Sequence, residues 1–183
     1  MNTQTLTKQT SKQTTKVKYL TLTGLMAAMI ALMTAYICHI PFGANGGYIH
    51  FGDSLIYIAA TILPTPYAIA AAAIGGGIAD LLTAPMWTIA TIIIKMLITI
   101  PFTNKSTKII TTRNVIATFI AYWISHTGYF LAEYILFGNF TSAFFGSIGG
   151  IIQSGGSAVF FIIFGLALDK AHIKAKLANQ ITA

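Results

Sequence analysis

The stretch "YAIAAAAIGGGIADLL", residues 67–82, carries one charge in an otherwise apolar run. Its length approaches the roughly 20 apolar residues that an α-helix needs to cross a bilayer. Similar runs recur along the chain, in which 55% of the 183 residues are hydrophobic and 8% are charged. Soluble domains carry about 25% charged residues. The composition therefore excludes a soluble domain and predicts an all-α integral membrane protein with little mass outside the bilayer.

Breaks in the apolar pattern divide the chain into six predicted transmembrane helices. Proline marks two of these breaks, in "PTP" at 64–66 and in "TAP" at 83–85. The segment at 1–15 is polar and lacks apolar periodicity, which predicts a flexible polar cytoplasmic tail before a single six-helix membrane domain at 16–183. The expected spans cover about residues 18–38, 51–63, 67–83, 87–103, 114–137 and 146–168.

The basic residues indicate on which side of the membrane each end of the chain lies. Ten of the eleven lie before the first span, in the loop at 104–113 or after the last span. Six spans put both termini on one side, and the positive-inside rule then places the N and C termini and this loop in the cytoplasm. The net charge of +7 is thus a topology signal, and no nucleic acid is expected as a partner. Cys38 is the sole cysteine, which excludes an internal disulfide and a multi-cysteine metal site.

Polar side chains inside the spans mark a candidate binding site. A charge in hydrocarbon costs from about 2.5 kcal/mol upward on insertion scales, so such residues usually pair or function. By helix register these groups lie in the outer half of the membrane or at its midplane, which predicts a cavity open to the outside. The inner half is expected to hold apolar side chains. The candidate substrate-binding residues are Trp87, Thr91, Lys95, Trp123, His126, Tyr129, Glu133 and Gln153.

Two aspartates are expected to support this site. Asp80 lies just below the outer end of its span, within reach of Lys95 across the short "TAP" turn, so we expect it to keep Lys95 charged and oriented. A purely structural ion pair and a ligand role are both compatible with this spacing. Asp53 starts the second span and is interpreted as a helix N-cap. Taken alone, His126 could be a core histidine, and Trp87 could belong to the aromatic belt at the membrane surface. Because the polar groups of several spans lie at one depth in the membrane, a binding site is favoured.

The loop after the first span has the composition of a gate. The stretch "HIPFGANGGYIHFG", residues 39–52, combines Pro41 with several glycines. Its segment "GANGGY" at 43–48 is expected to close over the site. The predicted gating residues are Gly43, Asn45, Gly46, Gly47 and Tyr48.

Two longer stretches resemble a known family. "IHFGDSLIYIAATILPTPYAIAAAAIGGGIADLL" at 49–82 and "WTIATIIIKMLI" at 87–98 are similar to one branch of the S components, the substrate-binding subunits of energy-coupling factor (ECF) vitamin transporters. The resemblance covers nearly the whole chain. "LPTP" stands where a glycine-proline pair is common, so the inner turn is expected to differ slightly. Members of this branch are assigned to riboflavin-like, pyridoxine and hydroxymethylpyrimidine substrates.

The resemblance implies a vitamin-binding subunit without catalytic activity or a cofactor of its own, in the plasma membrane of a bacterial cell. Its partners would be a transmembrane T component and two cytosolic ATPase subunits that hydrolyse ATP, and delivery would proceed by toppling of the subunit in the lipid bilayer. Ala27 and Ala31 match the family's contact with the T component. The expected ligand is a small neutral or zwitterionic heterocycle, pyridoxine or hydroxymethylpyrimidine, with riboflavin as the alternative.

Two other classes fit the sequence less well. An intramembrane enzyme would use Asp80, His126 or Glu133 as an acid or base, but neither a GxSxG nor an HExxH motif occurs. A self-sufficient transporter would show inverted repeats, and no two halves with matching broken spans are found. No Walker motif occurs, so any ATP hydrolysis must come from a partner.

Overall fold

The structure is a computed structural model that describes residues 3–37, 39–43 and 45–182, with side chains from residue 13 to 181. Cys38, at the end of the first predicted span, and Ala44, within the predicted gate, lie outside the described residues, as do Met1, Asn2 and Ala183. The helices are α1 (Thr3–Leu32), α2 (Asp53–Ile62), α3 (Thr65–Thr83), α4 (Thr88–Thr99), α5 (Thr112–Phe137), α6 (Phe140–Lys170) and α7 (Ile173–Thr182). Short additions are a π-helical turn at Met33–Ile37, a 3-10 turn at Pro85–Trp87 and a hairpin of β1 (Ile40–Pro41) and β2 (Tyr48–Ile49).

The helices agree with the prediction of an all-α membrane protein. Four stretches in helices are long and apolar enough to cross a membrane, and two shorter apolar helices accompany them. The four are Gln13–Ile37, Thr65–Thr83, Thr112–Phe137 and Phe140–Lys170, and the shorter ones are Asp53–Ile62 and Pro85–Thr99. Each predicted span thus contains one helix. Six complete crossings and the cytoplasmic location of both termini stay predictions.

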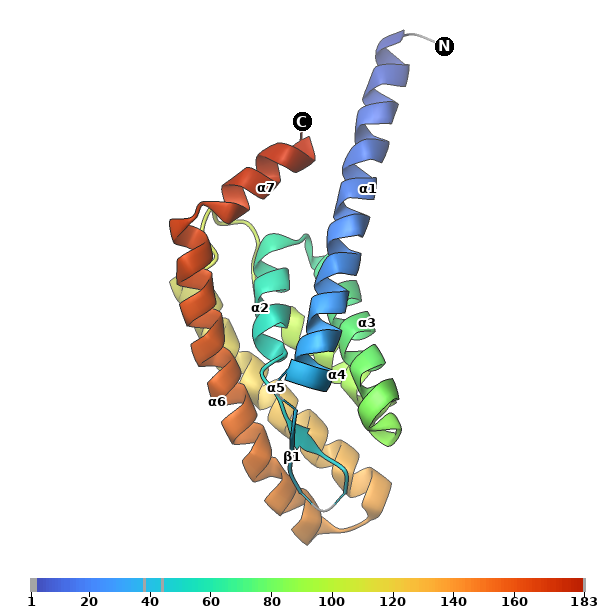
Figure 1. The fold of residues 1–183 in the computed structure, drawn as a ribbon, viewed down its shortest axis with the longest axis vertical. Coiled ribbons are helices and arrows are strands. Elements are labelled where there is room, and N and C mark those ends of the chain that lie inside the picture. The colour runs from blue at the N-terminus through green and yellow to red at the C-terminus, as the bar shows by residue number, and fades with distance from the viewer. Residues whose placement is uncertain (1–2, 38, 44, 183) are drawn as a thin grey trace.

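Capping residues explain where α5 begins and ends and where α6 begins. The side chain of Thr111 caps α5 by accepting the amide of Asn114 at 3.2 Å. Gly138 takes a left-handed conformation, with φ of 64°, and ends α5. The side chain of Asn139 then caps α6 by accepting the amide of Ser142 at 3.1 Å. These residues make a sharp reversal, so α5 and α6 run antiparallel and side by side (Figure 1).

The first helix is longer than expected. Residues 3–15, predicted to form a flexible tail, continue α1 as a helix. No glycine or proline occurs before Gly24, so nothing in this polar segment interrupts the helical backbone. The division into a tail and a membrane domain stays a prediction.

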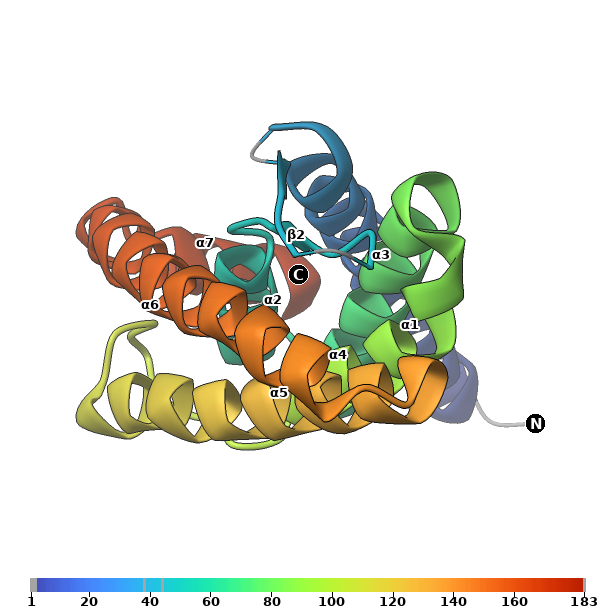
Figure 2. The ribbon, with the colours of Figure 1, turned by 90° about the horizontal axis from the view of Figure 1, so that it is seen from below.

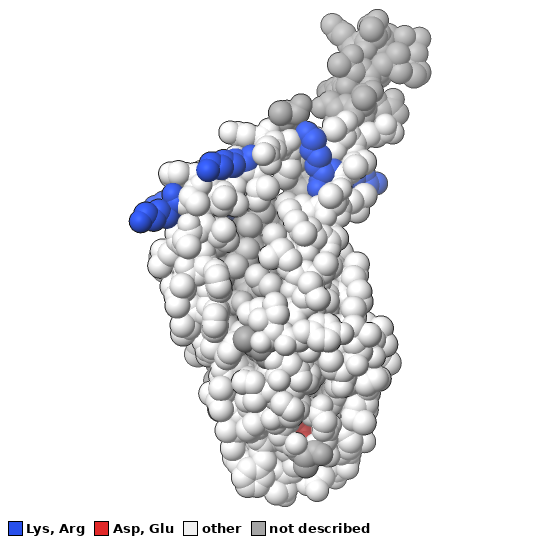
Figure 3. All heavy atoms as spheres, in the orientation of Figure 1, with Lys and Arg blue, Asp and Glu red and all other residues white. Residues whose placement is uncertain are grey.

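The bundle has two distinct ends. Both termini lie at one end, which we call the terminal end, and the hairpin lies at the other, the loop end (Figure 1). Lysine and arginine side chains gather at the terminal end (Figure 3). α1 packs on α3 and α3 on α4, while the short α2 contacts α1, α3 and α6 (Figure 2). α7, which the sequence did not predict, returns from α6 to α1, where Lys18 Nζ donates to the carbonyl of Gln180 at 2.7 Å.

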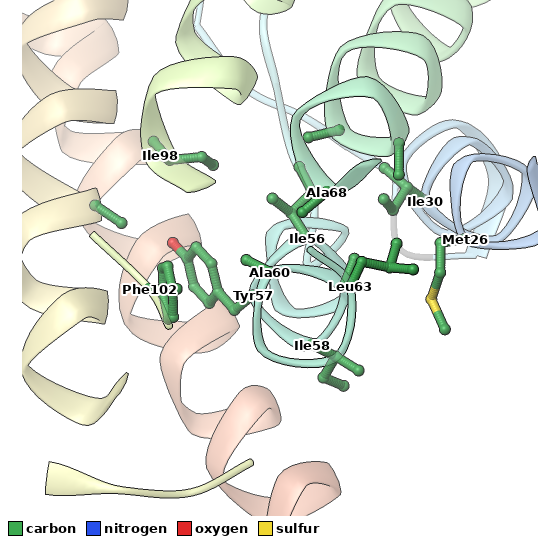
Figure 4. Packing of buried hydrophobic residues seen from close by; sticks show 14 of the residues in the cluster. Met26, Ile30, Ile56, Tyr57, Ile58, Ala60, Leu63, Ala68, Ile98 and Phe102 are labelled. Atoms are coloured by element: carbon green, nitrogen blue, oxygen red, sulfur yellow. The ribbon is translucent and has the colours of Figure 1, made fainter. Parts of the chain in front are cut away.

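The core of the terminal half is aromatic. Tyr57 of α2 stacks on Phe102 with ring centroids 4.8 Å apart (Figure 4). Phe161 of α6 meets both rings edge-on. This half also buries polar side chains such as Thr61 and Thr99, contrary to the expectation of an apolar inner half. Their hydroxyls donate to carbonyls of their own helices at 2.8 and 2.7 Å, which makes their burial cheap.

Small residues bring α1 and α3 close together. A side chain at Gly75 would run into the carbonyl oxygen of Ala27, because its Cβ would lie 2.7 Å away. Ala27 and Ala31, expected on a partner-facing surface, are 4% and 9% exposed and pack inside the chain. A partner could contact them only if α1 and α3 separated. Gly24 and Ala28, in contrast, are exposed on α1.

Candidate functional site

A cavity of about 100 Å³ lies at the loop end, between the hairpin loop at 39–50 and the ends of α3 to α6. The structure brings most of the predicted site residues to its wall. They are Asp80, Trp87, Thr91, His126, Tyr129, Glu133 and Gln153 from the helices, and Gly43, Asn45, Gly47 and Tyr48 from the predicted gate. Whether these side chains contact a ligand stays a prediction.

Four predicted site residues are not part of this wall: the exposed Trp123, the turn residue Gly46, and the buried Lys95 and Asp53. Trp123 is 51% exposed on the outer surface of α5, edge-on to His126 with ring centroids 6.1 Å apart. It lies one turn from His126 on α5, but its side chain is on the exposed flank of the helix. Gly46 does not line the cavity; its positive φ of 69° serves the turn of the hairpin.

The buried charges form a different pair from the one expected. Lys95 Nζ lies 2.6 Å from a carboxylate oxygen of Asp53, and the two side chains are 1% and 0% exposed. Gln153 donates to the other Asp53 oxygen at 3.4 Å. The predicted Asp80–Lys95 pair and the predicted N-cap role of Asp53 are therefore wrong. Gly52 takes the cap position without a side-chain bond, and the Asp53 carboxylate turns inward because burial of Lys95 demands a counter-charge.

Asp80 instead holds the loop. Its carboxylate accepts a hydrogen bond from the Tyr48 hydroxyl, which joins α3 to strand β2. The Tyr48 ring stacks on His39 with centroids 3.9 Å apart. Burial and the neighbouring carboxylate raise the pKa of Tyr48 well above its usual value, so the phenol keeps its proton and stays the donor.

The tip of the loop is bound to three helices. The Asn45 amide donates to Glu133 at 2.9 Å and to Ser142 at 2.8 Å, and Ser142 donates to the same Glu133 oxygen at 2.9 Å. The Trp87 indole donates to the Asn45 carbonyl at 3.2 Å. Asn45 thus fastens the cover of the cavity to the 3-10 turn that precedes α4, to α5 and to α6.

His50 was missed by the sequence reasoning, although it lies in the quoted "IHFGD". Its Nδ1 accepts the amide of Gly52 at 3.0 Å, and its own amide donates to Gln153 at 3.4 Å. Burial, with a smaller contribution from the nearby Lys95, lowers the pKa of His50 to about 3. The ring is therefore neutral at physiological pH and accepts from Gly52, while the backbone amide of His50 couples the loop to the buried ion pair through Gln153.

Glycines of α6 make room for the cavity wall. A side chain at Gly149 would collide with the Phe42 ring, and one at Gly146 would collide with the Glu133 carboxylate. Phe42 and Ser142 were also missed by the sequence reasoning. Phe42 carries no charge and belongs to a loop, so only the folded loop reveals its role. Ser142 lies at helical spacing from Gly146, Gly149 and Gln153, and this shared face of α6 is a signal that could have found it.

The site has the features of a binding pocket. Its wall combines aromatic rings with a few polar groups, as small-molecule sites do. The Thr91 and Tyr129 hydroxyls share a hydrogen bond of 2.9 Å. The Nδ1 atom of His126 is buried and has no hydrogen-bond partner among the described residues, so it can bond a ligand. Among those residues no group of three potential metal ligands occurs.

A helical membrane protein with such a pocket at one end belongs to the class of membrane-embedded small-molecule binders. A model of the family "ECF-type riboflavin transporter, S component" matches residues 14–171, and the chain belongs to this family. The prediction of an ECF S component is thereby confirmed. The family comprises transporter subunits rather than enzymes. The chain is also similar to an uncharacterized protein of the gap 3' region in Pyrococcus woesei, with 26% identity over 132 residues, 68% of this chain and 88% of the relative.

Proposed function

We propose that the protein is the vitamin-binding subunit of an ATP-driven importer and captures a small aromatic heterocycle, pyridoxine or hydroxymethylpyrimidine, in the loop-end cavity. The observation that carries this proposal is the cavity itself, covered by a loop that side-chain hydrogen bonds hold to α3 and α5. Such bonds break and re-form without unfolding of a helix, so the loop at 39–50 can open to admit a ligand.

The wall supplies the contacts that such a ligand needs. Trp87 and Tyr129 meet edge to face with ring centroids 6.2 Å apart and offer an aromatic surface to a flat ring. Thr91, His126 and Gln153 offer hydrogen bonds at its edge. Lys95 and Asp53 act from beneath the wall as an internally neutralised pair.

Cavity size supports a single-ring ligand. A volume of about 100 Å³ is small beside the roughly 300–1,000 Å³ of sites for drug-sized molecules, so a larger ligand requires a larger displacement of the loop. Riboflavin is the second candidate, because the matching family carries its name.

The remaining parts of the transporter follow from the family. A T component and two cytosolic ATPases would drive transport, with ATP hydrolysed on the partner subunits, in the plasma membrane of a bacterial cell. The basic terminal end supports a cytoplasmic location of both termini. The exposed Gly24 and Ala28 support a contact with the T component on the face of α1 beside the predicted Ala27 and Ala31.

Mass spectrometry of small molecules released from the purified protein tests this function. We expect a B-vitamin or a vitamin precursor, together with co-purification of the ATPase subunits from a membrane that contains them. Release of no such compound, combined with no saturable binding of added vitamins, would contradict the proposal. Substrate uptake by the chain alone in liposomes would contradict it as well.

A further inference from the structure

The cavity wall carries negative charge without a balancing cation. Asp80 and Glu133 both line it, and among the described residues no lysine or arginine does. Lys95 lies on α4 one helical turn beyond the wall residue Thr91, but its ammonium is held by Asp53 at 2.6 Å. The pair neutralises itself below the wall, so the two carboxylates remain uncompensated.

Each wall carboxylate keeps accepting capacity for a ligand. One oxygen of Glu133 accepts from Asn45 and Ser142, while the other faces Gly146, itself a residue of the cavity wall. One oxygen of Asp80 accepts from Tyr48. An ionised carboxylate offers about four acceptor positions, so neither group is saturated by these bonds.

The aromatic residues of the wall reinforce this preference. Trp87 is 6% exposed and its indole meets the Tyr129 ring at a centroid distance of 6.2 Å. Faces of Trp and Tyr attract cations, and aromatic boxes beside carboxylates are the usual means of binding organic ammonium groups. The Lys95 ammonium already lies 5.3 Å from the Tyr129 ring centroid, which shows that this ring accommodates a positive charge.

Resting on the proposed function, we infer that the pocket selects heterocycles that carry a positive charge, such as a ring-bound ammonium group, and rejects phosphorylated or carboxylated ones. The ligand's cation lies beside the aromatic rings of Trp87 and Tyr129 and is neutralised by Asp80 and Glu133. An anionic ligand would face two carboxylates without a cationic partner in the wall. Phosphorylation of the vitamin must therefore follow transport rather than precede it.

Three compounds with one ring test the inference, because they differ mainly in charge: pyridoxamine, pyridoxine and pyridoxine phosphate. Binding to the purified protein is measured by calorimetry at pH 7. We expect pyridoxamine to bind about tenfold more tightly than pyridoxine and the phosphate not to bind measurably. Asp80→Asn and Glu133→Gln should each reduce the preference for pyridoxamine about tenfold while pyridoxine affinity changes less.

Asp169→Asn is the matched control, because this carboxylate lies at the terminal end and accepts the amides of Ile109 and Ile110. It should leave the preference unchanged. Equal or tighter binding of pyridoxine, no binding of any of the three compounds, or an unchanged preference in both wall variants would overturn the inference. The proposed function has a separate test, since an uncharged vitamin released from the purified protein would sustain it while overturning the charge selection.

Discussion

The loop half and the terminal half of the bundle satisfy their polar groups in different ways. In the loop half, several bonds join two side chains from different elements, as in Asp53–Lys95, Tyr48–Asp80 and Asn45–Glu133, beside bonds to backbone such as that from Trp87 to the Asn45 carbonyl. In the terminal half, side chains bond to backbone. Asp169 accepts two successive amides at 2.7 and 2.9 Å, and Asn114 bonds both the amide and the carbonyl of Thr103.

This difference separates a movable half from a fixed one. Bonds to backbone fix the chain itself, whereas bonds between side chains can be exchanged by rotamer changes on a fast timescale. The loop half can therefore exchange its internal bonds for bonds to a ligand. The terminal half keeps its helices in place while this happens. The following variants are designed to break or sharpen this contrast, in order of expected effect.

The largest effect is expected from Lys95→Met. Removal of one partner leaves the fully buried Asp53 carboxylate unpaired, which should lower the free energy of unfolding by about 3–5 kcal/mol. The double variant Asp53→Leu with Lys95→Met should recover most of this loss, because no buried charge remains. Denaturant unfolding in detergent micelles measures both. If the double variant is no more stable than Lys95→Met, the loss of stability does not come from an unpaired Asp53 carboxylate.

In the terminal half, Asp169→Ala should lower the free energy of unfolding by about 1–3 kcal/mol, since it strips the amides of Ile109 and Ile110 of their acceptor. Ligand affinity should stay within about twofold, because the cavity lies at the other end. Asp169→Asn retains one acceptor and should lose less stability. A tenfold loss of affinity in Asp169→Ala would contradict the separation of the halves.

Acid should destabilise the loop half through His50. Its pKa is lowered to about 3 from an ordinary value near 6.5, so the unfolded chain takes up a proton before the folded one. The stability that the neutral ring contributes is complete above pH 6.5 and falls by about 1.4 kcal/mol per pH unit as the pH drops below it toward 3. Unfolding curves at pH 7, 6 and 5 measure this slope. His50→Gln should flatten it, and an unchanged slope in that variant would assign the effect to other groups.

A smaller effect is expected from Gly149→Ala. The added methyl group would displace the Phe42 ring and with it the loop at 39–50, so vitamin affinity should fall several-fold, about 1 kcal/mol, with little loss of stability. Gly155→Ala is the matched control on the same helix, because nothing lies within 4 Å of the position where its Cβ would be. Equal affinities of the two variants would show that Phe42 does not position the loop.

The sequence predicted the scaffold better than the contacts. Apolar runs and prolines locate each helix from α1 to α6, because length and hydropathy are local properties. Helical spacing placed His126, Tyr129 and Glu133 on one cavity wall. The prediction that Asp80 pairs with Lys95 failed because it relied on their nearness along the chain, across a turn of three residues. Asp53 and Lys95 are 42 residues apart and meet only when α2 packs beside α4.

Other residues had no local signal that separates their two possible roles. Trp123 follows the aromatic pattern of α5 but faces outward, and only the packing of α5 on α6 decides which side is covered. Ala27 and Ala31 form a small-residue face that would serve a partner or a neighbouring helix equally well. The close approach of α3 at Gly75 shows that Ala27 packs on a neighbouring helix, and the contact with a partner stays a prediction.

The central claim is that a vitamin binds in the loop-end cavity, and the two tryptophans allow a direct test. Trp87 lines the cavity and is 6% exposed, whereas Trp123 is 51% exposed outside it. In the variant Trp123→Phe, titration with the vitamin released from the native protein should quench the fluorescence of Trp87 saturably. In Trp87→Phe, the remaining Trp123 should report no change on addition of the same ligand. Quenching of Trp123 but not of Trp87 would place the ligand elsewhere and contradict the account.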